Sequence, residues 1–542
     1  MPLIAPRLVA AGLLLLPTAL PARQRPADHG SIVIIVGQEP ATPVPTLLGA
    51  KADNDVADLL FLRLARPGRA LNTADEKSFE PELAKSWSRR DSLTIVFELD
   101  PRAKWQDGAP VTARDVLFSF GRMRDSTVDP QRALLLRNLA TVTAEGDRRV
   151  VFRFRRAYAE QFYDATFHVQ LLPAHLVDTI PKERFASSSF VREPVGSGPY
   201  RIVRREPGRQ LELAGNPGFF LGPPKVDRVI FLVVRDPEAA LNLLLDGSAD
   251  AYEAVPPGTG PQRLAANPAL RLLTAPSFNV LYLLFNERAY GDRSQPHPLL
   301  ADAALRRALS MALDRSTLLR SVYGDYGVGT NAPVARAHWT QRLVPRGIGY
   351  DAAAARAQLQ KLGWSDRDGD GILDKNGAPL TLRLNFPSTS VTRSAMAPQI
   401  QEQFRKAGVR LELVRLDGPV WAQRRAKGEF DLDFSTAVMD PSPTGIVQSW
   451  TCAGRGGSNY GQYCDPAVDA QLERAFSRAA DGDWRTAYAT LQNDAPAIFL
   501  ASPPTLFALQ RRYRDVVLRP ESLYGDIWRW SVNPGQRIAR DR

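Results

Sequence analysis

Strand-like and helix-like segments alternate along the later part of this 542-residue chain. Apolar strand patterns occupy residues 380–386, 409–416 and 430–437, and a helical pattern covers residues 398–408 between the first two. Strands that alternate with helices are typical of an α/β fold, because each helix carries the chain back across a parallel sheet. The chain is also too long for one ordinary core, so we expect two or more domains.

The first third of the chain contains more strands that are joined by tight turns. Residues 93–99 and 150–158 alternate apolar and polar side chains, and Asp107 with the following glycine forms a hairpin-type turn. Residues 304–324, by contrast, are predicted to form one amphipathic helix that ends at Gly324. We therefore expect antiparallel hairpins early in the chain and strand–helix–strand units later.

The N-terminal residues have the composition of a secretory signal peptide. Arg7 precedes an apolar run, and small residues then lead to a cleavage site expected near Ala22. The apolar run is too short for a stop-transfer helix, and no later stretch is long enough to span a membrane. We therefore expect residues 1–22 to be removed, and the mature protein to be soluble and exported. No Cys lies near the cleavage site, so a lipid anchor is not expected.

The only two cysteines, Cys452 and Cys464, lie on either side of a glycine-rich loop. In an exported protein this arrangement indicates a disulfide. Closing so short a loop would stabilise the fold by roughly 3 kcal/mol. Metal binding by two lone cysteines is the less favoured interpretation.

The composition disfavours several classes of function. The net charge of +11 comes from scattered arginines rather than from a basic tract with aromatic residues, so nucleic-acid binding is not expected. The segment VGSGPY lacks the G-x-S-x-G pattern of a nucleophile elbow. The five histidines show no zinc-binding pattern. We therefore predict no catalytic residue, no metal and no cofactor.

An acidic stretch at residues 366–377 resembles a calcium loop. Asp366, Asp368 and Asp370 alternate as they do in an EF-hand, but the twelfth position, which needs a bidentate glutamate, is Gly377. A strand pattern comes next instead of a helix. We interpret the stretch as a helix-to-strand turn, with weak incidental calcium binding as the alternative.

Five segments match the pattern of a known family in the same order. They are FELDPRAKWQDGAPVTARDVLFSFGRM, VGSGPYRIVRREPGRQLELAGNPGFF, LYLLFNE, ALRRALSMALDR and DIWRWSV. Together they resemble the extracytoplasmic solute-binding proteins that include the dipeptide-, oligopeptide- and nickel-binding receptors of ABC importers. The resemblance covers nearly the whole mature chain. It implies a monomeric receptor that captures a peptide or a similar cationic solute and presents it to a membrane permease.

This resemblance also implies a fold. Family members have the two-lobed α/β fold of periplasmic binding proteins (type II), with the ligand cleft between the lobes and hinge closure around the ligand. Lobe I is then expected to comprise residues 23–282 and 503–542, with a hairpin-rich subdomain inserted at about 61–194. Lobe II is expected to comprise residues 283–502.

The ligand contacts that the resemblance implies lie mostly in lobe II. Asp440 matches an aspartate that pairs with the ligand's ammonium group, and Trp421 matches an aromatic residue of the pocket wall. Ser-Asn-Tyr between two cysteines is also found in the dipeptide-binding branch, which supports the disulfide and adds Asn459. Asn286 is expected to face the cleft near a crossover. Structural roles are the alternatives: a turn cap for Asp440, core packing for Trp421, and backbone hydrogen bonding for Asn286.

Two positions depart from the dipeptide-binding branch. Ala437 stands where relatives commonly have a Trp, and Pro387-Ser388 has no arginine where that branch places its carboxylate anchor; Arg393 lies nearby in a different register. A dipeptide, a longer peptide and a cation-bearing non-peptide therefore all stay open as ligands. A ligand sensor or chaperone-like module of the same fold is an alternative function, and a secreted hydrolase is a less favoured one.

Overall fold

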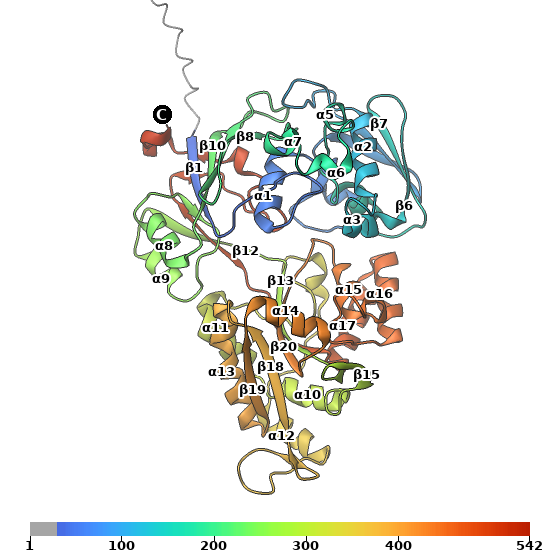
Figure 1. The fold of residues 1–542 in the computed structure, drawn as a ribbon, viewed down its shortest axis with the longest axis vertical. Coiled ribbons are helices and arrows are strands. Elements are labelled where there is room, and N and C mark those ends of the chain that lie inside the picture. The colour runs from blue at the N-terminus through green and yellow to red at the C-terminus, as the bar shows by residue number, and fades with distance from the viewer. Residues whose placement is uncertain (1–29, 542) are drawn as a thin grey trace, which may run out of the picture.

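The computed structural model describes residues 30–541 and has two lobes, one above the other in Figure 1. The predicted signal peptide lies outside the described residues. The upper lobe, lobe I, holds a seven-stranded and a four-stranded sheet, and the lower lobe, lobe II, holds a five-stranded sheet. The two-lobed α/β architecture expected from the sequence is confirmed.

The seven-stranded sheet of lobe I is parallel at its centre and antiparallel at its edges. Strand β1 pairs in parallel with β10 on one side and with β11 on the other, and it is buried along its whole length. In spatial order the strands are β12 (Leu270–Ala275), β22 (Thr505–Gln510), β11 (Ala251–Tyr252), β1 (Gly30–Val36), β10 (Val226–Val233), β9 (Gln210–Gly215) and β8 (Tyr200–Glu206).

The four-stranded sheet of lobe I is entirely antiparallel, as the alternating patterns of the first third predict. Helix α2 (Ala113–Met123) begins beside it, where the Asp115 carboxylate accepts a hydrogen bond from the Thr112 N–H at 2.8 Å. In spatial order the strands are β4 (Ala84–Asp91), β5 (Thr94–Leu99), β7 (Arg149–Phe154) and β6 (Leu139–Ala144).

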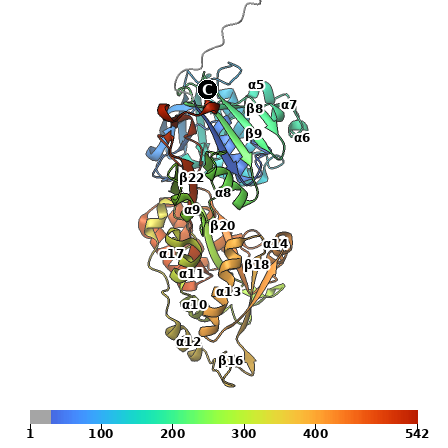
Figure 2. The same ribbon diagram turned by 90° about the vertical axis from the view of Figure 1, so that its left-hand side faces the viewer.

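The five-stranded sheet of lobe II has a parallel half and an antiparallel half. Strand β18 runs parallel to β19 and β20, and β13 runs antiparallel to β20 and β21. The β16–β17 hairpin precedes β18 and lies at the far end of lobe II in Figure 2, so the parallel strands run toward lobe I. In spatial order the strands are β19 (Arg410–Leu416), β18 (Thr381–Pro387), β20 (Leu432–Val438), β13 (Asn279–Phe285) and β21 (Ala497–Ala501).

The remaining helices and short strands cover these sheets. In lobe I they are α1 (Lys51–Leu60), α3 (Pro130–Leu135), α4 (Gln161–Thr166), α5 (Ala174–Val177), α6 (Lys182–Phe185), α7 (Ser189–Arg192), α8 (Pro237–Leu245), α9 (Gly260–Ala265), β2 (Ala65–Pro67), β3 (Phe79–Pro81), β23 (Tyr513–Arg514) and β24 (Ser531–Val532). In lobe II they are α10 (Ala303–Met311), α11 (Arg315–Tyr323), α12 (Ala352–Lys361), α13 (Val391–Lys406), α14 (Gly418–Lys427), α15 (Gly445–Trp450), α16 (Pro466–Arg478), α17 (Asp481–Asp494), β14 (Arg288–Ala289), β15 (Asp292–Pro296), β16 (Asp374–Lys375) and β17 (Ala378–Pro379). Across residues 30–541, no helix combines the length and the apolar character that crossing a membrane requires.

Two helix predictions are wrong in extent. The single helix predicted over residues 304–324 is two helices, α10 and α11, because the Asp314 carboxylate accepts a hydrogen bond from the Thr317 N–H at 3.0 Å and caps a new helix. The helix predicted from Pro398 begins earlier, at Val391, and Pro398 lies inside it.

The chain passes between the lobes twice. Residues 276–278 connect β12 to β13, and residues 502–504 connect β21 to β22. The two connections are in contact, because the Ser277 hydroxyl donates a hydrogen bond to the Pro503 carbonyl at 2.6 Å. The expected boundary between residues 282 and 283 falls inside β13. We therefore propose residues 276–278 and 502–504 as the hinge.

Candidate functional site

The end of lobe II that faces lobe I combines strand ends with exposed apolar side chains. Strands β18 and β20 are parallel and finish there, and α13 and α14 begin just beyond the ends of β18 and β19. In open α/β sheets, ligands bind outside the carboxyl ends of parallel strands. Val391, Val438 and Val420, which lie at this end, are 82%, 81% and 41% exposed. Apolar side chains left in water at one end of a sheet are typical of a binding surface.

Four side chains beside β20 form what we call the arginine–tryptophan cluster: Arg393 and Trp421 from the first turns of α13 and α14, Arg425 from further along α14, and Asp433 from the start of β20. The Trp421 indole N–H donates to the Asp433 carboxylate at 2.7 Å. The Arg425 guanidinium carbon lies 4.2 Å from the centre of the Trp421 ring, and that of Arg393 lies 5.3 Å from it. The cluster thus surrounds one aromatic ring with two cations and one carboxylate.

Asp433 is the buried acid of the cluster. It lies on β20 with no exposed surface, and its carboxylate also accepts a hydrogen bond from the Ser435 hydroxyl. Burial raises the pKa of Asp433 to about 6, while the Ser435 hydrogen bond and the Arg425 charge act in the opposite direction. The carboxylate therefore holds the indole in place at some cost in solvation.

The two arginines of the cluster retain unused hydrogen-bond donors. Arg393 donates through Nη2 to the Thr436 hydroxyl at 3.0 Å, but its Nη1 is buried without a partner in the described part of the chain, as is Nε of Arg425. Burial also lowers the pKa of Arg393. Buried guanidinium donors are costly unless they are paired, and a carboxylate is the group that pairs with them best. The cluster is therefore suited to an anionic group of a ligand.

Asp440 lies two residues beyond the end of β20 and is exposed. Its backbone carbonyl accepts a hydrogen bond from His338 Nε2 at 2.8 Å, and among residues 30–541 its carboxylate makes no hydrogen bond or ion pair. After burial, the charge of Asp440 is the next cause of the raised pKa of Tyr163 in lobe I. The Asp440 carboxylate is thus available and close to the opposite lobe.

Asn286 and Asn459 lie elsewhere and bond to the backbone. The Asn286 amide donates to the carbonyls of Gly428 and Phe430 at 3.0 and 2.9 Å, beyond the end of β13 that is remote from the hinge. These bonds match the alternative interpretation of Asn286 from the sequence, in which its side chain bonds to the backbone. The Asn459 amide donates to the carbonyls of Thr451 and Tyr463 at 2.9 and 2.7 Å. As ligand contacts, both asparagines stay predictions.

The predicted disulfide between Cys452 and Cys464 is present. It closes the loop between α15 and α16 that contains Asn459 and Tyr460. The Tyr460 ring lies 4.4 Å from the guanidinium carbon of Arg425. The disulfide loop therefore supports one side of the arginine–tryptophan cluster.

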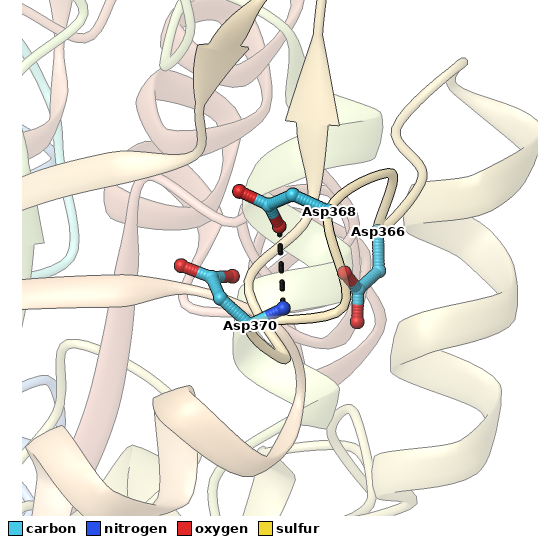
Figure 3. Close-up of side chains that lie close together, drawn as sticks. All are labelled: Asp366, Asp368 and Asp370. Carbon is cyan, nitrogen blue, oxygen red and sulfur yellow. Dashed lines mark hydrogen bonds between the residues drawn. The ribbon is translucent and has the colours of Figure 1, made fainter.

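The acidic loop is a turn between α12 and β16, as predicted. Figure 3 shows Asp366, Asp368 and Asp370 around the turn. The flanking elements α12 and β16 lie at the end of lobe II that is remote from lobe I in Figure 2. The carboxylates of the three aspartates accept hydrogen bonds from N–H groups of the loop itself, including those of Gly369 at 2.9 Å and Ile372 at 2.7 Å. These bonds explain the three aspartates as elements of the turn.

A cavity of about 290 Å³ lies within lobe I, away from these groups. Its walls carry arginines and acidic residues that pair with one another, as in Arg66–Asp526 at 2.8 Å and Arg519–Glu521 at 2.5 Å. We interpret this cavity as an ion-pair network of lobe I.

Residues 78–459 match the family described as bacterial extracellular solute-binding proteins, family 5. The match spans more than half of the chain. The chain belongs to this family. Family 5 members are binding proteins that act outside the cytoplasm.

Named relatives of this family 5 solute-binding protein are similar over most or much of its length. It is 24% identical to the oligopeptide-binding protein AppA of Bacillus subtilis, over 93% of this chain and 92% of that protein. It is 28% identical to a putative ABC transporter peptide-binding protein of Brucella ovis, over 67% of this chain and 66% of that protein.

Solved structures share the fold. The structure of AppA from Bacillus subtilis in complex with a nonapeptide has a TM-score of 0.75 at 23% identity, covering 94% of this chain and 100% of that one. The structure of NikA from Brucella suis in complex with Fe(III)-EDTA has a TM-score of 0.79 at 17% identity, covering 93% and 99%. At these identities the likeness concerns the fold alone.

The sequence indicated some residues of this end of lobe II and missed others. Trp421 and Asp440 were found through the family resemblance, and Arg393 was noted only as an arginine in a different register. Arg425 and Asp433 were missed. Asp433 alternates with apolar residues along a strand, a pattern that points to solvent rather than to a buried acid.

Proposed function

We propose that this family 5 solute-binding protein captures peptides in the periplasm and delivers them to an ABC permease. The relatives named as peptide-binding support the ligand class. The observation that carries the proposal is the pair of buried guanidinium donors without partners among the described residues, Arg393 Nη1 and Arg425 Nε, together with the Asp440 carboxylate, which makes no hydrogen bond or ion pair there.

The proposed ligand is a zwitterion that spans these two groups. Asp440 takes its ammonium group, and Arg393 with Arg425 takes its carboxylate. Arg393 bonds to Thr436, which lies four residues before Asp440, so the two anchors are separated by roughly 13 Å if the backbone stays extended. A dipeptide is shorter than this, whereas a tripeptide or tetrapeptide fits. The absence of an arginine at Pro387-Ser388 agrees with a ligand longer than a dipeptide.

The proposed mechanism is capture by closure. Trp421 and the three exposed valines accept side chains of the ligand from lobe II, and lobe I closes over them by bending at the hinge. A ligand shifts the lobes toward the closed form only through its greater affinity for that form. The closed form is then the form that the permease recognises.

We further propose that the chain performs no chemistry. The predicted absence of a nucleophile or an acid–base pair is consistent with a family of binding proteins. Incubation with a panel of peptides and esters tests this point, and any turnover that survives further purification would instead favour a hydrolase. A ligand sensor of the same fold would capture the peptide but not deliver it to a permease. Uptake of labelled peptide by cells that lack the gene separates the two functions, because only loss of an import receptor should reduce uptake.

Native mass spectrometry of gently purified mature protein is the first test. We expect several mass increments of small-peptide size that disappear on denaturation. Calorimetric titration with trialanine then tests the anchors: Asp440→Asn and Arg393→Gln should each weaken binding about tenfold or more. Asp368→Asn, in the remote acidic loop, serves as the matched control and should bind normally. A single non-peptide increment, or unchanged affinity in both anchor variants, would contradict the proposed ligand or the proposed site.

A further inference from the structure

The two lobes also meet at a buried polar contact centred on Glu160. Glu160 immediately precedes α4 of lobe I and is only 5% exposed. The Ser442 hydroxyl of lobe II donates to one of its carboxylate oxygens at 2.5 Å, and the Thr73 hydroxyl of lobe I donates to the other. The Trp339 indole of lobe II in turn donates to the Thr73 hydroxyl at 3.3 Å. Both lobes therefore contribute to the hydrogen bonds around one carboxylate.

This contact reaches the turn that carries Asp440. Ser442, which bonds to Glu160, lies two residues after Asp440, and its hydroxyl also accepts a hydrogen bond from the Thr444 N–H at 3.0 Å. On the other side of the turn, His338 Nε2 donates to the Asp440 carbonyl. The turn is thus held by His338 from its own lobe and by Glu160 from the opposite lobe.

The surroundings of Glu160 do not neutralise its charge. In the part of the chain that the structure describes, no lysine or arginine forms an ion pair with it. The titratable groups that face it are Asp164, His168, Tyr158 and Tyr163, and Asp164 itself contacts His168 at 3.2 Å. Burial raises the pKa of Glu160 to about 7; the two hydroxyl hydrogen bonds and His168 lower it, and Asp164 raises it further.

We propose that Glu160 is a positioning residue for the Asp440 turn, that it acts across the two lobes, and that it makes ligand affinity depend on pH. This inference rests on the proposed function, in which Asp440 binds the ammonium group of the ligand. When the lobes separate, Glu160 and Ser442 part and the carboxylate meets water. When the lobes close, Glu160 is buried again and fixes the turn.

The sign of the pH dependence is given by linkage. In water Glu160 titrates near its ordinary pKa of 4.5, and near 7 while it is buried against Ser442, a contact that the closed form keeps. Between these values the closed form binds more protons than the open form, so closure becomes more favourable as the pH falls from about 7 toward 4.5. Above that window the charged carboxylate must be buried at full cost. With these two values, ligand affinity should be roughly 40-fold higher at pH 5 than at pH 7.

Calorimetric titration of trialanine between about pH 5 and pH 7, where its α-ammonium group stays charged, tests the proposal in the wild type, Glu160→Gln and Glu160→Ala. The glutamine amide can donate to one hydroxyl and accept from the other without a charge, so Glu160→Gln should bind tightly and lose the pH dependence. Glu160→Ala should bind weakly at every pH. A Glu160→Gln variant that keeps the wild-type pH profile, or a Glu160→Ala variant that binds like the wild type, would overturn the proposal.

Glu473 supplies the matched control. It pairs with Arg156 of lobe I across the same interface at 2.5 Å, but its side chain is 58% exposed. Glu473→Gln should therefore leave the pH profile unchanged.

If trialanine binds at no pH, the proposed ligand is wrong, and small-angle X-ray scattering of the unliganded protein decides the role of Glu160 instead. A radius of gyration that falls on acidification in the wild type but not in Glu160→Gln supports it, and a wild-type radius that is independent of pH overturns it.

Discussion

At the scale of single residues, Trp421 depends on its neighbours for its position. Its indole N–H is bonded to Asp433, and the guanidinium groups of Arg393 and Arg425 lie near its ring. A carboxylate buried on a strand is unfavourable unless donors surround it, and here an indole, a hydroxyl and two nearby cations fulfil that need. The ring is therefore presented to the ligand in a fixed orientation.

Replacing Trp421 tests this arrangement. Trp421→Phe keeps an aromatic ring but removes the N–H, which leaves a buried Asp433 oxygen without its donor. We expect the free energy of unfolding in urea to fall by about 1–3 kcal/mol. The double variant Trp421→Phe/Asp433→Asn serves as the control, because the cost of the two changes should be less than additive. Strict additivity would show that the hydrogen bond contributes nothing.

His338 gives a second prediction at this scale. Its Nδ1 accepts a hydrogen bond from the Ala335 N–H at 3.0 Å and its Nε2 donates to the Asp440 carbonyl, so the ring must be neutral. Burial lowers the pKa of His338 to about 4. Below pH 6.5 His338 is protonated in the unfolded chain but stays neutral in the folded protein. The stability that neutral His338 gives to the folded protein is therefore lost as the pH falls from about 6.5 to 4.

The variant His338→Asn should therefore be less stable than the wild type by about 1–2 kcal/mol above pH 7. Because asparagine does not titrate, the difference should shrink as the pH is lowered. Urea unfolding at several pH values between about 4 and 8 measures it. A difference that stays constant with pH would mean that His338 titrates normally in the folded protein.

The sequence predicts some residues of the candidate site but not others. Asp440 was found by its spacing from a strand in a family pattern, without any knowledge of its exposure. Arg425 and Asp433 could not be found in that way, because their importance comes from which side chains they contact after folding. A pattern of alternating residues shows which side chains share a face of a strand, but it does not show which helix packs on that face.

At the scale of elements, α13 shows how a strong local signal can mislead. Proline favours the first turn of a helix, so the sequence predicts that this helix begins at Pro398. The structure adds a segment before Pro398, capped by Ser390, whose side chain accepts a hydrogen bond from the Arg393 N–H at 3.4 Å. That added segment places Arg393 next to Trp421. The error in the helix boundary is thus also the reason why Arg393 could not be assigned to the site.

The disulfide loop gives a prediction for an element. Replacing both Cys452 and Cys464 by serine should lower the free energy of unfolding by roughly 3 kcal/mol. Because Tyr460 of this loop lies against Arg425, peptide affinity should fall as well. Reductant should have the same effects on the wild type and none on the double variant. Full affinity with lowered stability would show that the loop does not support the site.

At the scale of the whole molecule, lobe II is a continuous segment enclosed between the two parts of lobe I. Apolar clusters fill it, and nearly all of their members come from residues 280–501; among residues 30–541, Leu71 is the one member of these clusters from lobe I, and Phe278 comes from the connection. The family resemblance predicted two lobes. The residue at which the chain crosses from lobe I to lobe II could not be predicted from the sequence of β13. An uninterrupted apolar strand does not show which sheet it joins.

A fragment of residues 279–501 should therefore fold by itself. Its first and last strands, β13 and β21, pair with each other, so the ends of the fragment lie side by side. We expect native-like circular dichroism and cooperative unfolding in urea. A shorter fragment that ends at residue 496 lacks β21 and should not unfold cooperatively. Failure of the longer fragment would mean that lobe II depends on lobe I beyond the contact of Leu71.

The contact between Ser277 and Pro503 has a consequence for kinetics. Two short connections that are bonded side by side prevent the lobes from twisting independently about either one, so their relative motion reduces to a single angle. A system with one coordinate and two minima relaxes with one rate constant. Stopped-flow mixing of peptide with the protein, monitored by tryptophan fluorescence, should accordingly show a single exponential for closure at every peptide concentration. In Ser277→Ala, where the two connections are released from each other, a second phase should appear.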